Sequence, residues 1–132
     1  MKSGEESIQK VKETPYVEMF LQNGILHFYY KKIETMDLTI AEACVRDRLE
    51  FTEHKAYPCL VDVIELKNFS KEARDYFAKE GNEGIIANAI LSGSTVTKMM
   101  ANFYISVNKP TNPTRMFTDK SSALKWLAQF KS

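Results

Sequence analysis

The last third of the chain constrains the fold more than any other part of the sequence. An apolar run, Ile85–Leu91, meets the turn Ser92-Gly93-Ser94, and an amphipathic segment follows. After a loop with two prolines come a short apolar segment, Arg115–Phe117, and a second amphipathic segment that carries Trp126. Strands that alternate with helices in this way predict an α/β protein whose helices cover a sheet. The pattern predicts an architecture and a crevice at the helix starts, but it does not predict a reaction.

Length and composition are those of one globular domain. The chain has 132 residues, of which 44% are hydrophobic and 27% are charged. A chain of that size buries most of its surface in a single core. The formal net charge is only +1. Because nucleic acids and anionic membranes select a clustered basic excess, we expect neither as the main partner.

The N-terminal residues lack the apolar content of an ordered element. The charged part of residues 1–14 offers only Ile8 and Val11 for burial, so we predict a flexible tail before a single domain over residues 15–132.

The chain shows no targeting or membrane-spanning pattern. Its start lacks the features of a secretory signal, and no run approaches the length of a membrane span, about 20 apolar residues. Cys44 and Cys59 lie in apolar surroundings without CxxC spacing. We therefore predict free buried thiols, a reducing compartment and a cytoplasmic location.

Asn23-Gly24 predicts a β-hairpin between Tyr16–Gln22 and Ile25–Tyr30, because both central residues of a type I′ turn need positive φ. A two-residue loop fixes the register. The face that we assign to the core then pairs Val17 with Tyr30, Met19 with Phe28 and Leu21 with Leu26.

Large side chains on the second face of the hairpin mark a contact site. We therefore predict self-association through this face or the methionine-bearing helix, with interface residues Phe20, His27 and Tyr29.

The middle of the chain repeats a helix and a strand. Thr39 and Glu42 have capping-box spacing, which predicts a helix from there to about residue 53. Pro58–Ile64 is an apolar run broken by one acidic residue, as expected of a strand buried on both faces. Ser70 then begins a second helix, and the parallel strands require right-handed crossovers.

The helix expected from about Ser94 to Val107 has the clearest period in the chain. Its apolar residues form one wide face: Val96, Met99, Met100, Phe103, Tyr104 and Val107. We expect this face to pack in the core, although its methionines also suit an apolar groove for a partner or an acyl chain.

A last helix from about residue 118 completes the predicted fold. The fold class is α/β, of order β-β-α-β-α-β-α-β-α, with a mixed sheet of about five strands, an N-terminal β-hairpin and four helices. We expect the last helix to bury Ala123, Trp126, Leu127 and Phe130.

Several segments have patterns shared with known proteins. They are Pro58–Asp62, Asn68–Arg74, Asn102-Phe103 with Asn108-Lys109-Pro110 and Pro113-Thr114, and Arg115–Leu127. Together with the element order, they resemble a family of small, uncharacterised Bacteroidetes-type proteins with the SpoIIAA-like (STAS) fold, over about Tyr16–Phe130. The resemblance implies a SpoIIAA-like domain without an assigned activity. Wider relatives include anti-sigma-factor antagonists, which are switched by serine phosphorylation, and distant CRAL-TRIO proteins, which hold lipids.

Ser70 has two interpretations. In the antagonists, the switch serine lies in an Asp-Ser-x-Gly sequence at the start of the corresponding helix. This chain has Asn68-Phe69-Ser70-Lys71 there, without the aspartate or the glycine. We therefore expect Ser70 to be a helix N-cap, with a phosphorylation switch as the alternative.

The other candidate binding residues lie where strands end, because ligands of open α/β sheets collect there. Asp62 suits either the orientation of a ligand or a structural hydrogen bond. Ser92, Ser94 and Thr95 place hydroxyl and N–H groups at a helix start, which suits an anion, although most strand-to-helix turns need such residues. Met99 is the apolar member of the candidate site. No spacing indicates a triad or metal site, so we predict no catalytic residue, metal or cofactor.

Three functions from different classes fit these observations. The favoured one is a non-catalytic regulatory or protein-interaction domain that binds a protein through the helices after Ser70 and Ser94. The second is a small carrier of a lipid or another apolar ligand, which needs a cavity between sheet and helices. An enzyme is the third, since Asp62, Ser70, Ser92 and Thr95 form no recognisable catalytic set without a histidine or a basic residue among them.

Overall fold

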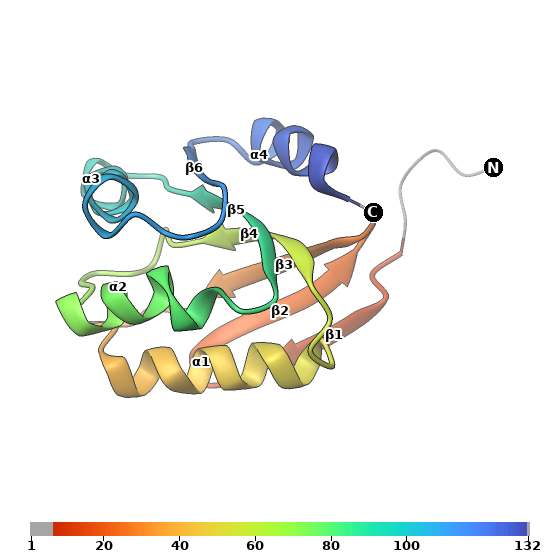
Figure 1. Ribbon diagram of the computed structural model, residues 1–132, viewed down its shortest axis with the longest axis horizontal. Helices are drawn as coiled ribbons and strands as arrows, with labels where there is room; N and C mark the ends of the chain where they lie inside the picture. Colours follow the sequence, from red (N-terminus) through yellow and green to blue (C-terminus); the bar gives the residue numbers. More distant parts are fainter. Residues whose placement is uncertain (1–6, 132) are drawn as a thin grey trace.

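The computed structural model describes residues 7–131 and has a six-stranded sheet with helices on both faces (Figure 1). The strands are β1 (Lys10–Glu13), β2 (Val17–Gln22), β3 (Ile25–Tyr30), β4 (Tyr57–Asp62), β5 (Ile85–Leu91) and β6 (Thr114–Phe117). The described α-helices are α1 (Leu38–Phe51), α2 (Lys71–Ala78), α3 (Thr95–Phe103) and α4 (Lys120–Leu127). Short turns of other helix types follow three of them: η1 (Glu80–Asn82), η2 (Tyr104–Asn108) and η3 (Ala128–Phe130).

The strands lie in the sheet in the order in which they occur in the chain. β1, β2 and β3 pair antiparallel, and β3, β4, β5 and β6 pair parallel, so the sheet is mixed as predicted. The hairpin register is also confirmed: Val17 pairs with Tyr30, Met19 with Phe28, and Leu21 with Leu26. These side chains are buried on the predicted core face.

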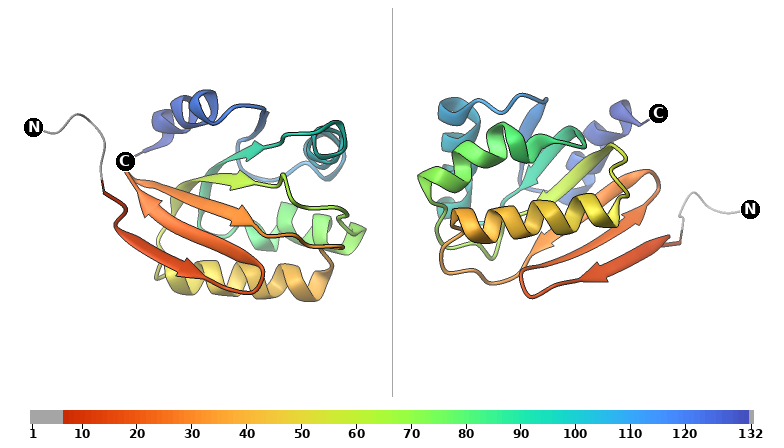
Figure 2. Two further views of the ribbon diagram at one scale, coloured as in Figure 1. Left: turned by 180° about the vertical axis from the view of Figure 1, so that it is seen from behind. Right: turned by 60° about the horizontal axis from the view of Figure 1, so that its bottom comes forward.

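Helices cover the two faces of the sheet unequally. α1 and α2 lie side by side over one face (Figure 2), and α3 packs on the same face near β5 and β6. α4 packs on the other face against β4 and β5, where Ala87 and Ala89 are fully buried. Their small side chains let the helix approach the sheet closely. Among the described residues, no helix is both long and apolar enough to cross a membrane.

The predicted N-terminal tail is wrong for part of its length. Lys10–Glu13 forms β1, which pairs with β2 at the edge of the sheet. Polar contacts hold this strand: Lys10 Nζ donates to the Phe51 carbonyl at 2.8 Å, and Lys31 Nζ donates to Glu13 Oε2 at 2.5 Å. Residues 1–6 of the predicted tail lie outside the described part of the chain.

The first helix begins earlier than its capping-box spacing predicts. Asp37 is the N-cap, and its Oδ1 accepts from the Ile40 N–H at 2.9 Å. An aspartate caps as well as a threonine does, so the predicted box from Thr39 to Glu42 is wrong. The strand expected over Pro58–Ile64 is β4, which ends at Asp62.

We predict that Leu127 anchors α4 more strongly than Trp126. Leu127 is fully buried, so Leu127→Ala is expected to lower the free energy of unfolding by about 3 kcal/mol. Trp126 is only partly buried, in ring contacts with Phe117 and Phe130, which corrects the expectation that it is a core residue. Trp126→Ala should therefore cost less in a urea titration, and the exposed control Lys125→Ala should cost almost nothing. A larger loss from Trp126→Ala would contradict the described orientation of α4.

Candidate functional site

α3 exposes much of its apolar face to solvent. Four side chains, at 56, 66, 46 and 57% exposure, form what we call the α3 stripe: Val96, Met99, Phe103 and Val107. The expectation that this face packs in the core is therefore wrong for these four residues. The side of the helix that faces the sheet buries Thr97, Ala101 and Tyr104 instead.

The end of α3 has an unusual backbone. The chain continues from Phe103 into a π-helical turn, η2, before Lys109 takes a left-handed conformation with φ 50°. π-helical turns occur mostly as local insertions and are frequent at functional sites. The Arg74 guanidinium lies over the Phe103 ring, with 4.8 Å between the guanidinium carbon and the ring centroid. α2 thus contacts the middle of the α3 stripe.

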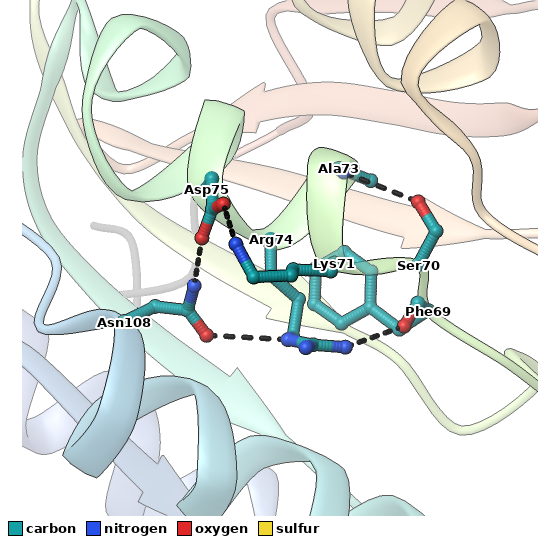
Figure 3. Close-up of polar contacts among 7 residues, drawn as sticks. All are labelled: Phe69, Ser70, Lys71, Ala73, Arg74, Asp75 and Asn108. Carbon is teal, nitrogen blue, oxygen red and sulfur yellow. Dashed lines mark hydrogen bonds and ion pairs between the residues drawn. The ribbon is translucent and has the colours of Figure 1, made fainter.

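A polar network fixes α2 to the end of η2 (Figure 3). Arg74 donates through Nε to Asn108 Oδ1 at 3.2 Å and through Nη1 to the Phe69 carbonyl at 2.8 Å. Asn108 Nδ2 in turn donates to Asp75 Oδ1 at 2.6 Å, and Lys71 Nζ donates to Asp75 Oδ2 at 2.8 Å. The hydrogen bond from Lys71, above all, lowers the pKa of Asp75. Sequence spacing did not reveal this network, because its members come from segments far apart in the chain.

The candidate residues lie at the neighbouring ends of β4 and β5, where the hydrogen bonds that they make are local or structural. Ser92 is fully buried, with its hydroxyl 3.3 Å from Met116 Sδ, so it lies in the core. The Ser94 hydroxyl accepts from the Thr97 N–H at 3.1 Å in a capping box, and Thr95 is exposed on the first turn. Asp62 Oδ1 accepts from the Ile64 N–H at 3.0 Å. Burial raises the pKa of Asp62.

The second face of the hairpin is less exposed than we predicted. His27 has only 3% exposure, and its ring stacks on Phe20 with 4.4 Å between centroids. Phe20 and Tyr29 are partly buried, and Lys120 of α4 lies 5.7 Å from the centroid of the Tyr29 ring. α4 therefore shields part of the predicted interface. Burial, with a smaller effect of the Lys120 charge, lowers the pKa of His27 to about 4.

A cavity of about 70 Å³ lies between the sheet and the helices α1, α2 and α3. Most of its lining is apolar, including Phe28, Val61, Phe77 and Met100. Asn88 also lines it, from the middle of the otherwise apolar strand β5. A single amide side chain in an apolar strand is a sequence signal for a buried polar position. The sequence analysis did not identify Asn88 by this signal.

The two thiols and the acidic residues suggest no metal site. Cys44 and Cys59 are free and buried, and burial raises the pKa of each thiol to about 12. Such thiols stay protonated and react slowly. Within the described residues, no group of three or more histidine, cysteine or acidic side chains is placed to hold a metal ion.

Comparison with known proteins identifies a family and a fold. The model of a family described as "Domain of unknown function (DUF7793)" matches residues 19–131. The chain is also similar to the crystal structure of an uncharacterized protein from the DUF3478 family with a SpoIIAA-like fold, from Shewanella loihica PV-4. That match covers 96% of this chain and 98% of the other, with a TM-score of 0.53 and 18% sequence identity. It confirms the SpoIIAA-like fold. A search of curated proteins finds no significant match.

We predict that Ser70 has a structural role. Its hydroxyl accepts from the Ala73 N–H at 3.2 Å, as an N-cap does. Ser70→Ala is expected to lower the free energy of unfolding by about 1 kcal/mol, whereas Ser70→Asp should retain the cap and add a favourable charge at the helix start. Chemical denaturation measures the free energy of unfolding of both variants. Ser121→Ala, on the exposed side of α4, is the control. Phosphate on Ser70, found by peptide mass spectrometry of protein from its own host, would revive the switch interpretation.

We also predict that His27 makes the fold sensitive to acid. The folded state binds the His27 proton only near pH 4, but the unfolded chain binds it near pH 6.5. Stability is therefore full above about pH 7 and falls as the pH drops, by about 2–3 kcal/mol near pH 4.5. His27→Phe should remove this part of the pH dependence, as measured by urea unfolding at several pH values. His54→Asn, at an exposed left-handed position, is the control and should keep it. Equal pH profiles for His27→Phe and the wild type would refute the assignment.

Proposed function

The chain belongs to the DUF7793 family, and we propose that it is a non-catalytic protein-interaction domain that binds its partner through α3 and the adjoining surface of α2. The observation that carries the proposal is the α3 stripe. Its four large side chains lie along one side of a single helix and are each about half exposed or more. Aligned apolar side chains of this kind mark contact sites, whereas scattered ones are ordinary.

The charge of the chain segment that carries the α3 stripe indicates what kind of partner fits, since the nearby carboxylate of Asp75 on α2 is already paired with Lys71 and Asn108. No aspartate or glutamate occurs between Gly84 and Thr118, but Lys98, Lys109 and Arg115 do. All three are exposed. A partner surface that combines apolar side chains with carboxylates would bury the stripe and also meet these cations. We therefore propose an acidic, amphipathic protein segment as the partner.

The network around Arg74 supports a role for α2 in the same surface. It joins the start of α2 to Asn108 at the end of η2, so the partner would meet two elements that are already fixed relative to each other. Preorganised surfaces bind with a smaller entropic cost. The wider relatives of the family that the sequence resembles include anti-sigma-factor antagonists, which is compatible with a regulatory interaction domain. We also propose that the protein has a Bacteroidetes-type origin and a cytoplasmic location.

Self-association is the second candidate. Phe20 and Tyr29 are partly exposed, and Val11 on the neighbouring strand is 63% exposed. The uncovered part of this face lies beside α4, over β1 and β2. A symmetric dimer would bury the same patch on both copies. The shielding of His27 makes this patch smaller than the sequence predicts.

The carrier and enzyme hypotheses have less support. An engineered cavity of about 150 Å³ is needed to hold benzene in a well-studied case, and the cavity described above has about half that volume. A lipid chain would require the helices to move apart.

For an enzyme, the described candidates Ser70, Ser92 and Ser94 each have their hydroxyl in a structural contact.

Site-specific photo-crosslinking in the host cell tests the proposed function. A photoreactive amino acid at Met99 is expected to give a discrete adduct with another protein, and the same group at the exposed position Gln129 should not. Adding Phe103→Lys, which places a charge in the stripe, should reduce the Met99 adduct severalfold. Absence of an adduct at Met99, or equal adducts at both positions, would contradict the proposal. An adduct with twice the mass of the chain, formed also by the purified protein, would instead identify a second copy as the occupant.

A further inference from the structure

The cavity beneath α2 and α3 is small. Its lining includes Asn88 and Ile90 of β5, Val61 of β4 and Phe28 of β3, on the face of the sheet opposite α4. A volume of about 70 Å³ admits only a small molecule.

One polar atom of this lining has no partner. Asn88 is 8% exposed, and its Oδ1 is buried without a hydrogen bond among the described residues. Buried polar atoms are nearly always satisfied, so an unsatisfied one calls for an explanation. The backbone N–H of Asn88 does have a partner, the Pro113 carbonyl at 2.8 Å. Asn88 Oδ1 therefore lacks a hydrogen-bond donor within the described part of the chain.

Two other polar side chains of the lining are hydrogen-bonded to protein. Arg48 donates to the carbonyls of Gly81 and Glu83, at 2.7 and 2.9 Å. Asn82 Nδ2 donates to the Ala78 carbonyl at 2.9 Å and to Thr111 Oγ1 at 3.2 Å. The Tyr30 and Tyr104 hydroxyls also line the cavity. Among the described groups of the lining, Asn88 Oδ1 is the fully buried acceptor that lacks a hydrogen bond.

We propose that this cavity binds a small neutral molecule with an apolar body and one hydrogen-bond donor, such as a short-chain alcohol, and that Asn88 Oδ1 accepts the hydrogen bond. The apolar walls favour the aliphatic part, and the unsatisfied acceptor of Asn88 orients the donor end. Ligand sites commonly combine such an apolar lining with a few placed polar groups. A cation is excluded, because the buried Arg48 guanidinium lines the same cavity and burial of an unpaired charge is very costly. An anion is disfavoured at Asn88 Oδ1, because this atom is an acceptor and an anion has no hydrogen to donate to it. This site is independent of the α3 stripe, which lies on the outer side of the same helix.

NMR titration of the purified full chain with straight-chain alcohols tests the proposal. From methanol to n-butanol, we expect saturable shifts of the Asn88 side-chain amide and of the backbone amides of Ala89 and Ile90. Affinity should rise with chain length and then fall once the chain exceeds the cavity. Methyl propyl ether has the same heavy atoms as n-butanol but no donor, so it should bind at least about fivefold more weakly. Equal binding of the two isomers would overturn the role of Asn88, and no saturable shift with any alcohol would show that water alone fills the cavity.

A matched pair of variants tests the residue itself. Asn88→Leu removes the unsatisfied acceptor and fills part of the space, so it should raise the melting temperature by several degrees and abolish the alcohol shifts. Asn102→Leu, at an exposed position of α3, should leave alcohol binding unchanged. A lower melting temperature for Asn88→Leu would assign Asn88 a structural role and refute the proposal. If that variant failed to fold, the comparison of n-butanol with its ether in the wild type would still decide.

Discussion

Burial of β4 and β5 on both faces is the constraint on which the rest of this structure depends. Leu60, Ala87 and Ala89 lie fully buried on the side of α4, and Cys59 is almost fully buried on the opposite side. A strand buried in this way needs a helix on each face and parallel neighbours joined by crossovers. The positions of all four described helices follow from that requirement. The DUF7793 chain shares this arrangement with the SpoIIAA-like fold.

The sequence predicted the parts of the fold that depend on local chemistry. Asn23-Gly24 determined the hairpin and its register, the apolar run Ile85–Leu91 became β5 with the same bounds, and Ser70 became the N-cap of α2. In each case a turn, a run or a cap contains its own signal within a few residues. The start of α1 shows the limit of such signals. Asp37 and Thr39 are both suitable N-cap residues and lie two positions apart, so local sequence does not decide which of them begins the helix.

Features that depend on distant contacts were not predictable. β1 contains one apolar residue and is held by Lys10 and Glu13 to residues far along the chain, which no local pattern reveals. Helical periodicity places Met99 and Phe103 on an apolar face, but it does not say how much of that face the sheet will cover. The sheet takes the side with Thr97, Ala101 and Tyr104, whose sizes allow close packing. The same limit applies to the cavity, because a void depends on how three helices fit together.

The order of the strands has a consequence for how the chain folds. Each strand pairs with the strand that precedes it in sequence, so none has to insert between two partners that are already joined. Each parallel pairing joins residues that a whole crossover separates, so loop closure is the main entropic barrier at each addition. The domain is thus able to grow from the hairpin toward β6, one crossover at a time. During synthesis, the N-terminal half can begin to pair before the C-terminal half has left the ribosome.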